Sequence, residues 1–250
     1  MIAMPPDQIV FFSMAAVVAF LIGLSKGGLG GMLGALATPL MALVMPAQLV
    51  IGLILPLLMF ADIFAVAFHW RRWNKHLIIL LIPGAIVGVT IGTLFITNAP
   101  TEALRTLLGI IVLAFTVYKI LENRIMGALK YEGKNWHGYL AGTITGFSSS
   151  LAHTGGPPVS IYLILQDVPP RVFIATSALF FMILNWIKVP YYWYAGLFDL
   201  EKLTQIVWIL PLLPLGVATG RWMGVRVSKE IFERIIIVLL GITGVMLIVT

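Results

Sequence analysis

The chain has 250 residues, of which 60% are hydrophobic and 10% are charged, and its mean hydropathy is +1.03. A soluble domain carries about 25% charged residues, so this composition excludes an ordinary soluble fold and predicts an all-α polytopic membrane protein. The absence of cysteine excludes disulfides and thiolate metal sites. The net charge of +6 is ordinary loop charge for this class, and we expect no nucleic-acid partner.

Ten apolar segments follow one another along the chain, and most are long enough to cross a bilayer. We predict helices at about 9–25, 30–45, 49–69, 77–97, 104–121, 137–151, 157–166, 172–195, 204–220 and 232–250. They form a first transmembrane repeat over 1–122, a linker over 123–136 and a second transmembrane repeat over 137–250. The first segment has no basic residue before it, so we do not interpret it as a signal peptide.

The charges in the loops predict which side of the membrane each loop occupies. The loops near 70–76, 122–136 and 221–231 carry Lys and Arg, and the positive-inside rule makes them cytoplasmic. The loop near 98–103 has neither residue, and the loop near 196–203 is mainly acidic, so both are predicted outside. Ten segments threaded through these assignments place both termini outside.

The two repeats are visible as an internal similarity. A shift of 123 residues aligns Gly23 with Gly146, Pro46 with Pro169 and Trp70 with Trp193, and it aligns Asp62 with Asn185. After an insertion near 197–202 the shift becomes 128, which aligns Pro83 with Pro211, Gly88 with Gly216 and Gly92 with Gly220. Each repeat has five segments, an odd number, so the repeats have inverted topology, which is a transporter architecture.

Each repeat opens with a short pair of segments joined by a polar, glycine-rich stretch. The stretch "GLSKGGLGG" at 23–31 contains Lys26, and its partner "GFSSSLAHTGGPP" is at 146–158. The segment at 157–166 is too short to span a bilayer, so we predict a broken, re-entrant helical hairpin in each repeat. Irregular backbone at membrane depth is tolerated where it lines a cavity, and helix N-termini facing that cavity favour anions.

Two less specific interpretations of these stretches stay open. Glycines in membrane helices often mark close packing, and a lysine near a helix end can extend to the interface. Serine hydroxyls also bond to carbonyls of their own helix. The sequence leaves open whether the hairpins are re-entrant or fully spanning.

Several other polar residues lie inside the predicted spans. Asp62 is a functional candidate by default because it is acidic in mid-span; it could carry a coupling proton, pair with Lys26 or belong to a structural ion pair. His153 could carry a proton or act as a neutral hydrogen-bonding residue. We expect Lys188 to extend towards the outer interface, and we expect an interfacial aromatic belt formed by Trp70, Trp73, Tyr191, Tyr192, Trp193 and Tyr194.

The stretches "GLSKGGLGGMLGALATPLMAL" and "GFSSSLAHTGGPPVSIYLILQDVPPRVFIATSALFFMILNWIKVPYYW" resemble the sulfite exporter TauE/SafE family of bacterial membrane proteins. The resemblance covers nearly the whole chain, and it implies transport of a sulfur-containing oxyanion such as sulfite, sulfoacetate or another organosulfonate across the bacterial inner membrane. The substrate-binding candidates are Ser25, Lys26, Gly27, Gly28, Ser148, Ser149, His153, Thr154, Gly155, Gly156 and Asn185. The proton-coupling candidates are Asp62 and His153.

Other classes fit the residues less well. A serine hydrolase would need a base and an oxyanion hole next to the serine, and here serines and His153 lie in one short segment, so we expect no enzyme. A metal-cation permease would need more ligands than Asp62 and His153, and Lys26 opposes a cation. An anion channel, or a permease for another small carboxylate or oxyanion, stays open as the alternative. We expect a small anion and the lipid bilayer as partners, no cofactor and no metal, and the apolar outer faces leave a homodimer open.

Overall fold

The computed structural model describes residues 6–29, 33–128, 133–226 and 229–249, and these residues form helices and turns with no strand. By length and composition, five helices within these ranges can cross a membrane: Gln8–Gly27, Ala47–Phe68, Lys75–Asn98, Thr101–Glu122 and Pro170–Tyr194. The segments Leu200–Ile209 and Leu212–Met223, bent by 49° at their junction, would form a sixth span. The chain is therefore a multi-pass helical membrane protein.

The elements follow the predicted order with modest shifts at their ends. They are α1 (Pro6–Leu24), a π-helix η1 (Ser25–Leu29), α2 (Gly34–Ala42), α3 (Ala47–Phe68), α4 (Lys75–Asn98), α5 (Thr101–Ala128), α6 (Asn135–Ala152), α7 (Gly156–Leu165), α8 (Pro170–Tyr194), α9 (Leu200–Gln205), a short 3-10 helix η2 (Val207–Ile209), α10 (Leu212–Arg226) and α11 (Lys229–Val249).

Two predicted boundaries differ from the structure for physical reasons. Helix α5 continues to Ala128, beyond the predicted end at 121, because Glu122, Asn123 and Arg124 do not break a helix. The single segment predicted at 204–220 is instead divided into α9, η2 and α10. Pro211 lies between η2 and α10 and Pro214 lies in the first turn of α10, and a proline has no backbone N–H to continue the hydrogen bonding of a helix.

The closest helix contacts join the first and second halves of the chain. Helix α4 packs along α6, α1 and η1 pack along α10, α5 along α11 and α3 along α8. Glycine allows the closest of these approaches: a Cβ atom on Gly142 of α6 would lie 2.1 Å from the Leu81 carbonyl oxygen of α4. A Cβ atom on Gly220 of α10 would lie 2.5 Å from the Leu24 carbonyl oxygen of α1.

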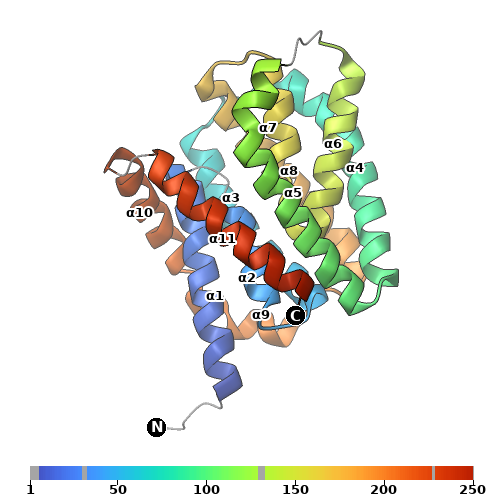
Figure 1. Ribbon diagram of the computed structural model, residues 1–250, viewed down its shortest axis with the longest axis vertical. Coiled ribbons are helices and arrows are strands. Elements are labelled where there is room, and N and C mark those ends of the chain that lie inside the picture. Colours follow the sequence, from blue (N-terminus) through green and yellow to red (C-terminus); the bar gives the residue numbers. More distant parts are fainter. Residues whose placement is uncertain (1–5, 30–32, 129–132, 227–228, 250) are drawn as a thin grey trace.

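Figure 1 shows the arrangement of the long helices. The helices α1 and α10 lie on the left of the view and α4 and α6 on the right, and α11 runs obliquely between these sides to pack along α5. The start of α1, the end of α11, α9 and the turn from α4 to α5 all lie at the lower end of the view. The end of α5 and the start of α6 lie at the upper end. Apolar side chains of α1, α2, α3 and α10 form the largest buried cluster, which includes Ile22, Met41, Ile54 and Leu213.

Candidate functional site

Five polar side chains from four separate elements form one connected cluster in the interior. These are Lys26 of η1, Asp62 of α3, Ser149 of α6, and Asn185 and Lys188 of α8, and we call them the polar cluster. It connects the two glycine-rich openings, since Lys26 belongs to the first and Ser149 to the second. The pairing of Lys26 with Asp62, one of the roles considered for Asp62, is present.

Lys26 reaches the polar cluster because α1 changes to a π-helix at its C-terminal end. The five residues Ser25–Leu29 form this wider turn, which has the sequence SKGGL. Single π-turns at the ends of α-helices are frequent at functional sites. The Lys26 side chain is 20% exposed, its Nζ lies 2.5 Å from Asp62 Oδ1, and it lies 5.8 Å from the centre of the Phe181 ring.

Asp62 is fully buried in α3, and both of its carboxylate oxygens have a donor. Oδ1 accepts from Lys26, and Oδ2 accepts from the Asn185 side-chain amide at 2.7 Å. A buried carboxylate is stable only when it is paired and hydrogen-bonded. The arrangement therefore suits an ionised Asp62, and it leaves Lys26 as the partly exposed side of the pair.

The prediction that Lys188 extends to the outer interface is wrong. Lys188 is fully buried, and its Nζ contacts the Ser149 carbonyl oxygen at 3.0 Å, Ser149 Oγ at 2.7 Å and Asn185 Oδ1 at 3.1 Å. Residues three apart on a helix share a face, so the side chain of Lys188 follows Asn185 into the interior. The spacing of these two residues was the signal that could have identified Lys188 as a member of the site.

Tyr192 also differs from expectation, because it belongs to the core and not to an interfacial belt. It is fully buried, and its hydroxyl donates to the Ser150 carbonyl oxygen at 2.8 Å. The neighbouring Trp193 and Tyr194 are 60% and 90% exposed, as an interfacial position requires. Tyr192 therefore holds the C-terminal end of α6 against α8.

The second opening breaks where α6 ends. His153 adopts the left-handed conformation with φ of 54°, and α7 begins two residues after Thr154, at Gly156, with prolines at its first turn. The Nδ1 atom of His153 lies 3.1 Å from Thr38 Oγ1 of α2. This contact joins the break in the second half of the chain to α2, the short helix that follows the break in the first half.

Several buried polar atoms around this break have no hydrogen-bond partner among the residues that the structure describes. They are Thr145 Oγ1, His153 Nε2 and Thr154 Oγ1. Buried polar atoms are normally satisfied, so their presence at the N-terminus of α7 indicates a place where water or a polar ligand binds.

The other predicted substrate-binding residues are not members of the polar cluster. Ser148 Oγ donates to the Ile144 carbonyl oxygen, which confirms the alternative in which a serine bonds to its own helix, and Ser150 does the same with Gly146. Gly27 serves close packing, because a Cβ there would lie 2.3 Å from the Val217 carbonyl oxygen. Ser25 and Gly28 lie in η1 beside Lys26. A Cβ atom on Gly155 would contact Ser149 and Thr145, and a Cβ atom on Gly156 would meet no atom within 4 Å.

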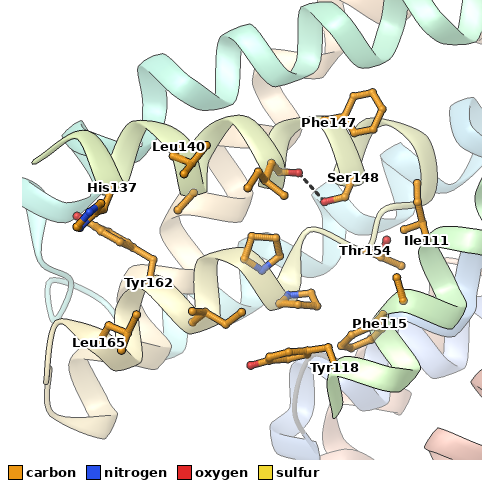
Figure 2. A pocket seen from close by; sticks show the side chains of 16 residues that line it. Ile111, Phe115, Tyr118, His137, Leu140, Phe147, Ser148, Thr154, Tyr162 and Leu165 are labelled. Atoms are coloured by element: carbon orange, nitrogen blue, oxygen red, sulfur yellow. Dashed lines mark hydrogen bonds between the residues drawn. The ribbon is translucent and has the colours of Figure 1, made fainter. Parts of the chain in front are cut away.

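An apolar cavity of about 590 Å³ lies between α5, α6 and α7 (Figure 2). His137, Tyr162 and Leu165 lie at one end, and Ser148, Thr154 and Ile111 lie at the other. None of the five members of the polar cluster lines it. An apolar lining offers little to an anion, so the polar cluster and not this cavity is the candidate anion site.

Among the described residues, no three His, Asp or Glu side chains lie close enough to hold a metal ion. The family model described as "Sulfite exporter TauE/SafE" matches residues 15–247. Searches of curated proteins and of solved structures found no match.

Proposed function

Since the chain belongs to the sulfite exporter TauE/SafE family, we propose that it is a secondary transporter of a small sulfur-containing oxyanion. Sulfite, sulfoacetate and other organosulfonates are the substrates in this proposal. The observation that carries it is the polar cluster, which joins the broken openings of both halves through Lys26, Asp62, Asn185, Lys188 and Ser149.

The proposal includes two repeats of inverted topology, and helix packing supports it. The sequence shifts pair α1 with α6 and α4 with α10, and the contact of α4 with α6 has its counterpart in that of α1 with α10. The correspondence extends to single residues. Gly27 contacts Gly220, and their aligned partners Ser150 and Gly92 also meet, with a Cβ on Gly92 lying 2.8 Å from Ser150 Cβ.

We place the chain in the bacterial inner membrane with both termini outside. The start of α1, the end of α11 and the two loops with little basic charge lie at one end of the molecule (Figure 1). The end of α5 and the start of α6 lie at the other end, which the positive-inside rule makes the cytoplasmic end. Alternating access would then expose the polar cluster to each side in turn.

Lys26 is the primary anion-binding group of the proposed site. It is the partly exposed cation of the cluster, and an oxyanion can replace Asp62 as its partner. The unsatisfied polar atoms of Thr154 and His153, which lie at the break before α7 and outside the polar cluster, are the further donors of the proposal. These groups match the several oxygen atoms of a sulfonate or sulfite.

Proton coupling is the finer part of the proposal, and Asp62 and His153 are its candidates from the sequence. An anion that takes Lys26 leaves the Asp62 charge with only the Asn185 amide, and a proton on Asp62 would remove that charge. His153 acts in the same direction, because a nearby anion favours the protonated imidazole. Coupling matters because a net charge crossing the membrane works with or against about 2.3 kcal/mol per 100 mV.

Flux into liposomes that contain the purified protein tests the proposal. We expect saturable flux of sulfite or sulfoacetate that increases when a proton gradient is imposed. Absence of flux for sulfite, sulfoacetate and methanesulfonate would contradict the substrate class. Unsaturable flux that follows the membrane potential and ignores the proton gradient would instead identify an anion channel.

A further inference from the structure

We propose that Lys188 is a proton-exchanging residue of the anion site, an uncharged amine when the site is empty and an ammonium when an anion is bound. This inference rests on the proposed function of anion transport. It starts from an unusual environment: Lys188 is fully buried, and its three polar contacts go to the neutral residues Ser149 and Asn185. The only carboxylate in the cluster already pairs with Lys26.

The hydrogen bonds around Lys188 can be satisfied in either protonation state. An ammonium has three donors, which match the Ser149 carbonyl oxygen, Ser149 Oγ and Asn185 Oδ1. An amine has two donors and a lone pair, so it can donate to the two carbonyl oxygens and accept from the Ser149 hydroxyl. Only the hydroxyl hydrogen must turn when the proton arrives or leaves, because a hydroxyl both donates and accepts.

The charges that surround Lys188 favour a change of state on anion binding. The opposite charges of Asp62 on α3 and Lys26 on η1 cancel each other. His153 is the first residue after the end of α6. Helix α7 carries no acidic or basic residue, and α4 carries such residues only at its start, Lys75 and His76. A buried, uncompensated cation is costly, so the empty cluster is best balanced with an uncharged Lys188. An arriving monoanion restores this balance when Lys188 becomes an ammonium.

Asn185 links this change to the rest of the site. Its Nδ2 donates to Asp62 and its Oδ1 accepts from Lys188, so one side-chain amide connects the two groups. The two halves of the chain place corresponding residues in the polar cluster. Ser149 aligns with Lys26, and Asn185 aligns with Asp62. Lys188 thus brings to the second half the basic nitrogen that Lys26 brings to the first, with the difference that it has no acidic partner.

Proton uptake during anion binding is the direct measurement. The full-length protein in lipid nanodiscs is titrated with methanesulfonate, a fixed monoanion, by calorimetry at about pH 8 in two buffers of different ionisation enthalpy. We expect wild type to take up about one proton per bound anion. The Lys188→Met and Lys188→Gln variants should bind with uptake reduced to near zero. The control Lys119→Met removes a lysine of α5 that pairs with Glu122, and it should keep the wild-type uptake.

The outcomes separate the inference from the function on which it rests. Wild-type protein that binds neither methanesulfonate nor sulfite contradicts the proposed function and removes the basis of the inference. Wild-type binding without proton uptake overturns the role of Lys188 alone, and so does unchanged uptake in either Lys188 variant. If both variants fail to fold, infrared difference spectra of the wild type on anion binding decide together with the titration of His153→Gln. A band of a protonated carboxyl group that appears on binding assigns the proton to Asp62 and rejects the role of Lys188, and so does loss of uptake in His153→Gln. Uptake of about one proton in both proteins without such a band supports the role.

Discussion

The two halves of the chain open with the same local design and use different chemistry. In the first half the break is a π-turn that carries its own lysine, which pairs with an acidic residue. In the second half the break is at His153, which has a left-handed backbone conformation and is followed by a new helix. The basic nitrogen near this break belongs to Lys188 of α8, and its hydrogen-bond partners are neutral. The comparison shows that one opening holds a basic nitrogen in an ion pair, whereas the other holds a basic nitrogen among neutral partners.

The comparison predicts unequal effects at the aligned positions Lys26 and Ser149. Lys26→Ala removes a charged partner of the anion, which typically costs about 1.5–3 kcal/mol, or roughly a ten- to hundredfold loss of affinity. Ser149→Ala removes one of the three hydrogen bonds of Lys188 and no charge, which typically costs about 1 kcal/mol, so the affinity should fall roughly fivefold. Binding of methanesulfonate to the purified variants measures both effects. Equal losses would show that the two openings contribute in the same way, and the exposed Lys202→Ala is the control.

The glycines that join the halves should differ in their tolerance of a methyl group. A Cβ on Gly220 meets backbone atoms of Leu24, whereas a Cβ on the aligned Gly92 first meets the side chain of Ser150. Backbone cannot move aside locally, so Gly220→Ala should lower stability by about 1–3 kcal/mol and Gly92→Ala by less.

Thermal unfolding in a mild detergent compares these two variants with Gly241→Ala. A Cβ at Gly241 lies 3.9 Å from its nearest neighbour, and alanine favours a helix, so this control should be neutral or stabilising. Equal destabilisation by all three variants would argue against close packing as the reason for these glycines.

A third prediction concerns the pH dependence of anion affinity. If a proton enters with the anion, affinity falls as pH rises, by at most about tenfold per pH unit for one proton. Asp62→Asn should flatten this dependence, because the variant has one less negative charge to balance. His153→Gln should retain most of it, because His153 contacts Thr38 and lies outside the polar cluster. A flat profile in wild type, or equal slopes in both variants, would reject Asp62 as a coupling residue.

The smallest effect is expected at the ion pair of Asp199 and Lys202, at the start of α9. Hydrogen bonds from the Lys202 side chain and backbone N–H lower the pKa of Asp199, so its charge stabilises the folded state above the pKa of an unfolded aspartate. This contribution is lost as pH falls through the lowered pKa of the folded state. Because the pair lies at the surface and is partly exposed, Asp199→Asn should change stability by less than about 1 kcal/mol near neutral pH. Chemical unfolding at neutral and acidic pH measures the difference, which should disappear in acid.

Much of this fold could be predicted because apolar runs, prolines and loop charges act locally. The pairing of Lys26 with Asp62 was also within reach, because a buried charge in a membrane needs an opposite charge. The position of Lys188 could not be predicted, since a lysine near the end of a span usually reaches the interface. Only the rotation of α8 about its axis decides where the Lys188 side chain points. Tyr192 is a similar case: four adjacent aromatic residues suggest a belt, but a helix turns one of them into the core.

The glycine contacts have a mechanical consequence. The tightest contacts, α4 against α6 and α1 against α10, each join a helix of the first half to one of the second. Displacing the sequence halves as blocks would separate backbones that now touch. If the protein works by alternating access, each rigid body would therefore contain helices from both halves, with α1 and α10 in one and α4 and α6 in the other. The boundary between such bodies would cross the chain several times. Helix α3, which carries Asp62, contacts α1 and α8, and α8, which carries Asn185 and Lys188, contacts α4, so these two helices would connect the bodies.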